Sequence, residues 1–132
     1  MAGWTDALGN PEGLLAVFGG DPPDLAGVSV HEVTIGRDGP ALTVTFDLPA
    51  YPADPPAKWV RGRFDTVQVR LRLTGVTEVE LRGMSTGPVA DIRLRAGDPV
   101  RLELVSPGLT VTAVAAFADV AGFSAYQRAD TR

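Results

Sequence analysis

Short runs in which apolar and polar residues alternate are the feature that most limits how this chain can fold. The clearest run carries Val67, Val69, Leu71 and Leu73, with a polar side chain after each of the first three. Glycines and prolines, 15 and 11 in number, separate such runs along the chain. Alternation with a period of two is typical of strands, and the breaks indicate frequent turns. The sequence therefore predicts a mainly β fold of the α+β class, with about seven antiparallel strands in a curved sheet or a two-layer sandwich.

The first predicted hairpin joins residues 28–35 to residues 41–48 through a four-residue turn. Its register places Ile35 opposite Leu42, so that the apolar residues of the two strands share one face. The valines at the start of the first strand have the opposite parity, and a β-bulge at residues 31–32 would restore the pattern.

The second predicted hairpin spans residues 67–82 and is supported by two patterns. A three-residue loop sets Leu71 opposite Val79, which matches the apolar residues of both strands. The same register sets Arg72 opposite Glu78, which matches opposite charges. Because the two patterns agree, we expect these strands to be neighbours.

The remaining strands follow in the last third of the chain. Residues 92–94 and 102–104 predict a third hairpin, in which Arg93 lies opposite Glu103. A further turn leads into one strand over residues 109–120. Because this strand is apolar on both faces, we expect it to be central or covered by the N-terminal helix.

One short helix is predicted over residues 10–19. Asn10 is suited to cap its first turn, and the glycine at position 19 begins the break that ends it. We see no second domain and no long repeat, so residues 1–132 are expected to form a single domain. Residues 125–132 are expected to form a loose C-terminal tail.

Residues with obvious chemistry are few. The chain has no cysteine and one histidine, His31, which excludes disulfides and most metal sites, and no cofactor loop is visible. Asp47, Asp54 and Asp65 flank the Pro-rich stretch, defined as residues 49–64, and could converge as a carboxylate pair. Such residues beside proline and glycine more often form turns. We therefore predict no catalytic residue, no cofactor and no metal.

Charge is unevenly distributed along the chain. Residues 1–54 contain eight acidic residues and one basic residue, a balance of −7, whereas the whole chain has a net charge of −4. The acidic part could face a basic partner or form an ordinary solvated surface. A sequence pI of about 4.8 argues against a nucleic-acid partner. No secretory signal or membrane span is visible, so a cytoplasmic location is expected.

A set of short motifs adds a functional interpretation. In order, these motifs are Trp4, Asn10 before a short helix, Phe18-Gly19, Pro23-x-Leu25, Arg37-Asp38-Gly39-Pro40 and Pro55-Pro56-x-Lys58-Trp59. Their order and spacing, over roughly residues 4–117, resemble the immunity protein 50 family of bacterial polymorphic toxin systems. The resemblance implies a non-enzymatic cytosolic protein that is encoded beside a toxin and neutralises it by binding. It implies no catalytic residue.

Two parts of the chain are candidates for contact with such a toxin domain. The first is acidic and would suit a basic toxin; it contains Asp21, Asp24 and Glu32. The second is the Pro-rich stretch, which contains Asp54, Lys58, Trp59, Arg61 and Phe64. Trp59 and Tyr51 leave a rival function open. They could lie at a pocket mouth in a β-rich module that binds a carbohydrate or a small apolar ligand.

Overall fold

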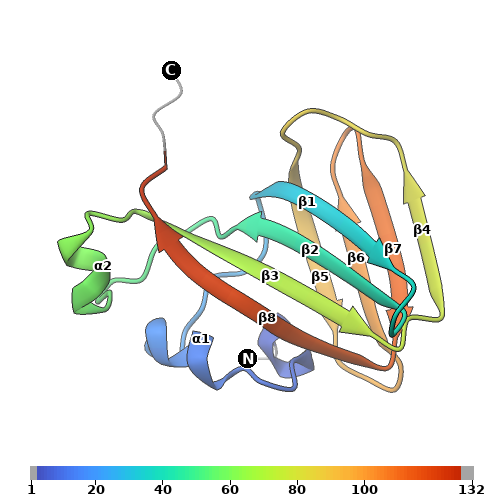
Figure 1. Cartoon of the computed structure of the whole chain (residues 1–132), viewed down its shortest axis with the longest axis horizontal. Helices are drawn as coiled ribbons and strands as arrows, with labels where there is room; N and C mark the ends of the chain where they lie inside the picture. The colour runs from blue at the N-terminus through green and yellow to red at the C-terminus, as the bar shows by residue number, and fades with distance from the viewer. Residues whose placement is uncertain (1–2, 129–132) are drawn as a thin grey trace.

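The computed structural model describes residues 3–128 and places them in one antiparallel sheet with two short helices and a 3-10 turn (Figure 1). In chain order the elements are η1 (Trp4–Ala7), α1 (Glu12–Val17), β1 (Val28–Gly36), β2 (Ala41–Asp47), α2 (Ala57–Arg61), β3 (Thr66–Thr74), β4 (Glu78–Arg82), β5 (Val89–Arg95), β6 (Val100–Val105), β7 (Thr110–Ala115) and β8 (Phe117–Tyr126). The mainly β prediction is confirmed. These residues form eight strands, because the run predicted as one strand over 109–120 is divided at Ala116 into β7 and β8.

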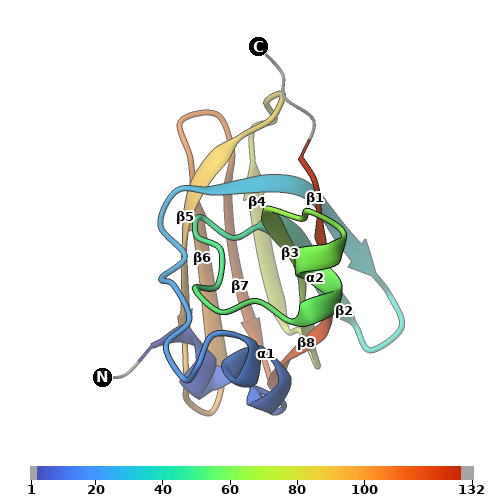
Figure 2. The same ribbon diagram turned by 90° about the vertical axis from the view of Figure 1, so that its left-hand side faces the viewer.

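The sheet is continuous but strongly curved. Its strands lie in the order β4-β7-β6-β5-β1-β2-β3-β8. β1 joins β5 only where Val28 lies opposite Ala90 and Ser29 opposite Val89. Beyond that point the two strands diverge, and the two halves of the sheet lie one over the other (Figures 1 and 2). The curved sheet, rather than two separate sheets, is therefore the arrangement that this sequence adopts.

The hydrophobic core lies between the two halves. Side chains of both halves enter it, and five of the most deeply buried are Phe46, Leu42, Leu71, Leu104 and Val111. In β3, β5, β6 and β7, buried apolar side chains alternate with more exposed ones. β2 is instead buried along almost its whole length, and β4 is exposed along all of it. Among residues 3–128, no helix combines the length and apolar character that crossing a bilayer requires.

Two of the three predicted hairpins have the expected register. β1 and β2 pair with Ile35 opposite Leu42, and their register shifts between Val30 and Glu32, where the bulge was predicted. β5 and β6 pair with Arg93 opposite Glu103. In both cases a short turn joins strands that are neighbours in the sheet, so local sequence determined the pairing.

The second predicted hairpin does not form. β3 pairs with β2 and β8, so Leu71 lies opposite Val44 and Val120. β4 instead crosses to the far edge of the sheet and pairs with β7, where Val79 lies opposite Ala113. The prediction was wrong because alternation fits any partner strand of matching parity. The ten-residue β8 contributes a longer partner for β3 than the five-residue β4 does.

The N-terminal segment covers the outer edge of β8 rather than beginning with a capped helix. Asn10 does not cap α1, because Pro11 occupies the N-cap position. The Asn10 side-chain amide donates to the Val120 carbonyl at 2.9 Å, and its oxygen accepts from the Val120 amide at 2.8 Å. The predicted cap was therefore wrong. The final strand was expected to be central or covered by the N-terminal helix, but β8 lies at the end of the strand order, and the residues that bond its outer edge, Gly9 and Asn10, precede α1.

The C-terminal end is more ordered than predicted. β8 continues to Tyr126, and the backbone amide of Arg128 donates to Asp65 Oδ1 at 3.0 Å. The prediction of a loose tail is therefore wrong for residues 125–128, because the side chains and backbone there have partners in β2 and beside β3. Residues 129–132 lie outside the described part of the chain.

Candidate partner-binding site

The Pro-rich stretch connects β2 to β3 and contains α2, a helix that the sequence analysis did not predict. Pro56 precedes the helix with extended ψ of 147°, and its carbonyl accepts from the amides of Trp59 and Val60 at 2.9 and 3.2 Å. The helix ends before Gly62, and Arg63 then adopts a left-handed φ of 56°. Five residues are too few to show a helical period, which explains why the stretch looked irregular.

Trp59 is held by aromatic side chains of its own protein. Its ring centroid lies 6.1 Å from that of Tyr51 and 6.4 Å from that of Phe123, which it meets edge to face. All three rings are half-buried and pack against the core. Trp59 therefore anchors α2 and the Pro-rich stretch to the sheet.

The other side chains of α2 point outwards. Lys58 and Arg61 are exposed, and Val60 retains 60% of its accessible surface. Asp54 is exposed and Phe64 half-buried in the flanking coil. α2 lies at one end of the molecule (Figure 1). It therefore presents two basic groups and one aliphatic side chain to solvent there.

The acidic candidates lie elsewhere. Asp21 and Asp24 are exposed in the connection between α1 and β1, and Glu32 is exposed on β1 just after the bulge. Asp24 and Glu32 line different hollows of the surface. The eight predicted contact residues therefore lie in three separate segments of the chain. Asp24 and Glu32 do not share a hollow of the surface.

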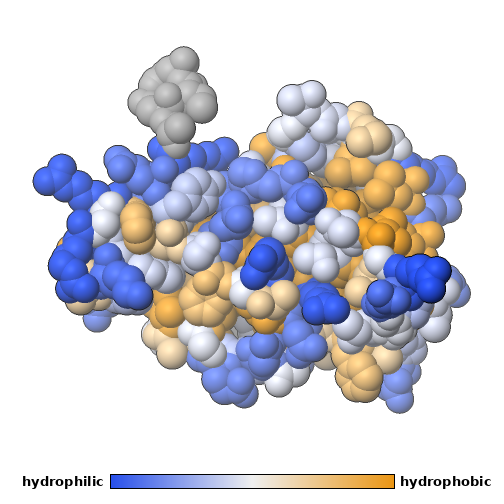
Figure 3. Space-filling model, in the orientation of Figure 1, coloured by the Kyte–Doolittle hydropathy of each residue, from blue (hydrophilic) through white to orange (hydrophobic). Residues whose placement is uncertain are grey.

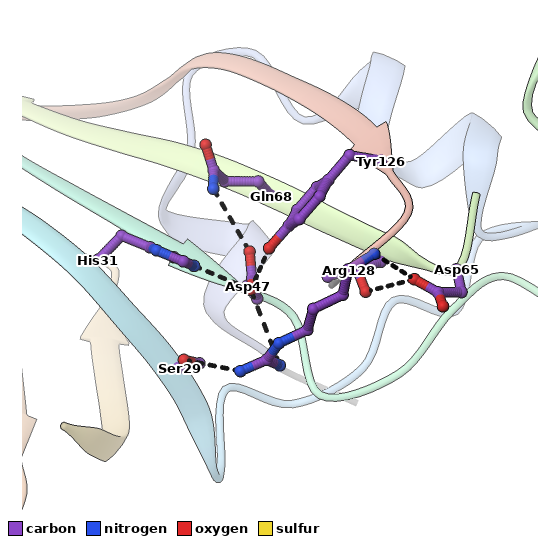
Figure 4. Close-up of polar contacts among 8 residues, drawn as sticks. Ser29, His31, Asp47, Asp65, Gln68, Tyr126 and Arg128 are labelled. Atoms are coloured by element: carbon purple, nitrogen blue, oxygen red, sulfur yellow. Dashed lines mark hydrogen bonds and ion pairs between the residues drawn. The ribbon is translucent and has the colours of Figure 1, made fainter. Parts of the chain in front are cut away.

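A polar cluster that the sequence analysis missed surrounds Asp47 at the end of β2 (Figure 4). The Asp47 carboxyl group is only 1% exposed. Tyr126 donates its hydroxyl to Asp47 Oδ2 at 2.6 Å, and His31 Nε2 lies 2.9 Å from the same oxygen. Arg128 Nη1 lies 3.8 Å from it, and Gln68 Nε2 donates to Oδ1 at 3.5 Å. This cluster ties the end of β8 to β1, β2 and β3.

Two groups in and beside the cluster have shifted pKa values. Burial, followed by the hydrogen bond to Asp47, raises the pKa of Tyr126 to about 12. The backbone amide of Arg128, followed by the Thr66 hydroxyl, lowers the pKa of Asp65. Tyr126 therefore remains a hydrogen-bond donor at neutral pH, as the neutral form that burial favours.

The cluster is structural in character. Arg128 contacts both Asp47 and Asp65, and each carboxylate accepts hydrogen bonds from donors of its own. Ser29 also joins the cluster, but its hydroxyl accepts from Arg128 Nη2 at 3.5 Å, and no hydrogen bond links it to His31 among the described residues (Figure 4). In residues 3–128, no group of three His, Cys, Asp or Glu side chains is placed to hold a metal ion.

In comparison with known proteins, the sequence model of the Immunity protein 50 family matches residues 10–125. The chain belongs to the immunity protein 50 family. Neither the curated proteins nor the solved structures gave a significant match. The matched region begins at Asn10 and includes α1, both halves of the sheet and all eight predicted contact residues, whereas Trp4 lies before it.

Membership of the immunity protein 50 family defines the general role. Proteins of this family are non-enzymatic inhibitors, so this member is not an enzyme, and its partner is a cognate toxin. The rival ligand-binding function would place the Trp59 and Tyr51 rings at the mouth of a pocket. In the structure the two rings pack on each other and against the core.

Proposed function

We propose that this immunity protein binds and neutralises the effector domain of a cognate bacterial toxin in the cytoplasm of the cell that makes both. The family match over residues 10–125 carries this proposal. Neutralisation by binding requires a stable scaffold with exposed contact residues rather than a catalytic centre. The curved sheet is such a scaffold, and α2 presents Lys58 and Arg61 on its surface.

The direct test uses the effector domain encoded next to this gene. Producing that domain in a bacterial cytoplasm should stop growth, and co-production of the immunity protein should restore it. The two purified proteins should form a stoichiometric complex in isothermal titration calorimetry. Restored growth without a complex would contradict neutralisation by binding, and a complex without restored growth would contradict neutralisation.

The Pro-rich stretch is the first surface to examine within this proposal. Lys58 and Arg61 flank the exposed Val60 on one helix, and the combination of basic and aliphatic groups suits a protein interface. Reversing both charges, Lys58→Glu with Arg61→Glu, should leave the melting temperature unchanged because both side chains are exposed. It should weaken toxin binding if α2 contacts the toxin, and equal affinity would exclude α2 from the interface.

A further inference from the structure

The free edge of β1 is an unusual feature of this sheet, because it lies inside the strand order rather than at either end. β1 pairs with β5 only through Val28 and Ser29, and the Val30 amide makes one more bond, to the Pro88 carbonyl at 3.0 Å. From Glu32 to Gly36, β1 pairs with β2 alone among the described strands. An extended backbone with one side unpaired can accept another strand.

An apolar notch lies beside this free edge, where β1 separates from the connection between β4 and β5. It has a volume of about 170 Å³, and its apolar lining includes Val30, Val33, Leu81, Met84 and Leu109. A closed cavity of about 150 Å³ can hold benzene, so the notch has room for one apolar side chain.

Exposed apolar side chains surround the notch. Met84 retains 89% of its accessible surface and Leu81 retains 41%. Ile35, on the same face of β1 as Val33, retains 56%. Figure 3 shows a hydrophobic patch at this side of the molecule, over the end of β1 and the neighbouring β4. Scattered apolar residues are normal on a surface, but a gathered patch beside a notch indicates a binding site.

The outer edge of β8, unlike the free edge of β1, is hydrogen-bonded to another segment of the chain. The Gly9 amide donates to the Ala118 carbonyl at 2.9 Å, and Asn10 occupies both backbone groups of Val120. That edge is therefore closed along its first half by the protein itself. The free edge of β1 has no such cover among residues 3–128, although it lies next to exposed apolar side chains.

The rim of the notch is acidic. Glu32 lines it, is exposed and makes no ion pair within the described residues. His31, its neighbour on the rim, faces Asp47 instead. The notch and its rim thus suit an apolar side chain with a basic side chain close to it.

We propose that this site binds an extended segment of the toxin, which pairs with the free edge of β1 and inserts an apolar side chain into the notch. A basic residue of the segment faces Glu32. The inference rests on the proposed function and adds the contact surface to it. Backbone pairing supplies affinity in this mode, and the notch supplies specificity for the inserted side chain.

Substitutions in the notch test the inference against the purified toxin effector domain. Met84→Lys and Leu81→Lys should each weaken binding by about tenfold or more, because a charge in an apolar anchor site opposes insertion. Met84→Leu should bind within about twofold of wild type, since it retains apolar volume. Val105→Lys is the matched control. Val105 is 47% exposed, and it lies on β6 opposite Asp91, on the outer face of the same half of the sheet.

Hydrogen exchange provides a second readout that does not depend on any variant. Amides in residues 32–36 should exchange more slowly in the complex than in the free protein, whereas those in the outer edge of β8 should be unchanged. If wild type binds but Met84→Lys and Leu81→Lys bind equally well and residues 32–36 gain no protection, this inference is wrong and the proposed function stands. If wild type does not bind at all, the proposed function itself fails.

Discussion

Trp59 has a structural role in the contact between α2 and the sheet, since its ring packs on Tyr51 and Phe123. Trp59→Ala should lower the free energy of unfolding by about 2–3 kcal/mol, below the range of ~3–5 kcal/mol for a fully buried tryptophan because the ring is half-buried. Urea unfolding followed by circular dichroism measures the change. An unchanged free energy of unfolding together with lost toxin binding would instead make Trp59 an interface residue.

Val60 provides the control for this substitution. It lies on the same helix, next to Trp59, and it is 60% exposed. Val60→Ala should change the free energy of unfolding by no more than about 0.5 kcal/mol. Comparison of the two variants separates loss of aromatic packing from a general effect of substitution in α2.

The raised pKa of Tyr126 predicts how the free energy of unfolding depends on pH in the alkaline range. Its pKa is about 12 in the folded protein and 10.0 for the reference phenol, so the folded state favours the protonated form. The stabilisation is complete below pH 10 and is lost as pH rises from 10 towards 12. Tyr126→Phe should therefore show a shallower fall in the free energy of unfolding across this range, measured by urea unfolding at a series of pH values.

Tyr126→Phe should also be less stable than wild type at neutral pH, because it removes a donor from the buried Asp47 carboxylate. Tyr51→Phe is the control at that pH. The Tyr51 hydroxyl is buried and has no hydrogen-bond partner in residues 3–128, so its removal should not reduce stability. Equal losses in both variants would contradict a specific role for the Asp47 cluster.

Among the described elements of the sheet, β8 has an outer edge with no neighbouring strand, and the Asn10 side chain forms hydrogen bonds with part of that edge. This side-chain amide satisfies both the amide and the carbonyl of Val120. Asn10→Ala should lower the free energy of unfolding by about 1–2 kcal/mol, because two hydrogen bonds to a strand edge are lost. Exchange of the Val120 amide should become faster.

Asn10→Asp refines this prediction. The carboxylate still accepts from the Val120 amide but cannot donate to the Val120 carbonyl, so its stability should lie between those of Asn10→Ala and wild type. Helical content is the distinguishing measurement. A marked loss of helix in Asn10→Ala would mean that Asn10 acts on α1 as a cap, contrary to the geometry.

The elements also show which parts of the fold were readable from sequence. The pairing of β1 with β2, including the bulge, follows from parity and a short turn, which are local properties. The pairing of β3 with β8 joins Leu71 to Val120, and nothing near either residue distinguishes this partner from Val79. Strand alternation specifies which side chains are buried, but it does not specify a distant neighbour.

The candidate site, like the fold, could be predicted from the sequence only in part. The exposed acidic residues and the charged side chains of α2 were identified from composition and position along the chain. Asp47 stood out only as an acidic residue before the Pro-rich stretch, because its partners His31, Gln68, Tyr126 and Arg128 come from separate parts of the chain. The notch was not identified because it arises where β1 and β5 diverge.

For the whole molecule, the acidic first part of the chain predicts how fast a toxin associates. Residues 1–54 have a charge balance of −7, and Asp21, Asp24 and Glu32 within them are exposed. If the toxin is basic, replacing these three residues with lysine should slow association by about tenfold at low salt and weaken its dependence on salt concentration. Stopped-flow fluorescence at several salt concentrations measures both.

A matched variant distinguishes a local electrostatic effect from one of net charge. Residues 55–132 have a charge balance of +3, because the whole chain has −4 and residues 1–54 have −7. Within them Glu78, Glu80 and Glu103 are exposed, and lysine at all three changes the total charge by the same amount. If the acidic first part steers the toxin, this control should slow association less than the first variant does. Equal slowing would indicate that net charge alone acts, and unchanged rates in both variants would show that the toxin is not attracted by charge. Because steering acts before contact, the dissociation rate should change little unless Glu32 also contacts the toxin at the notch.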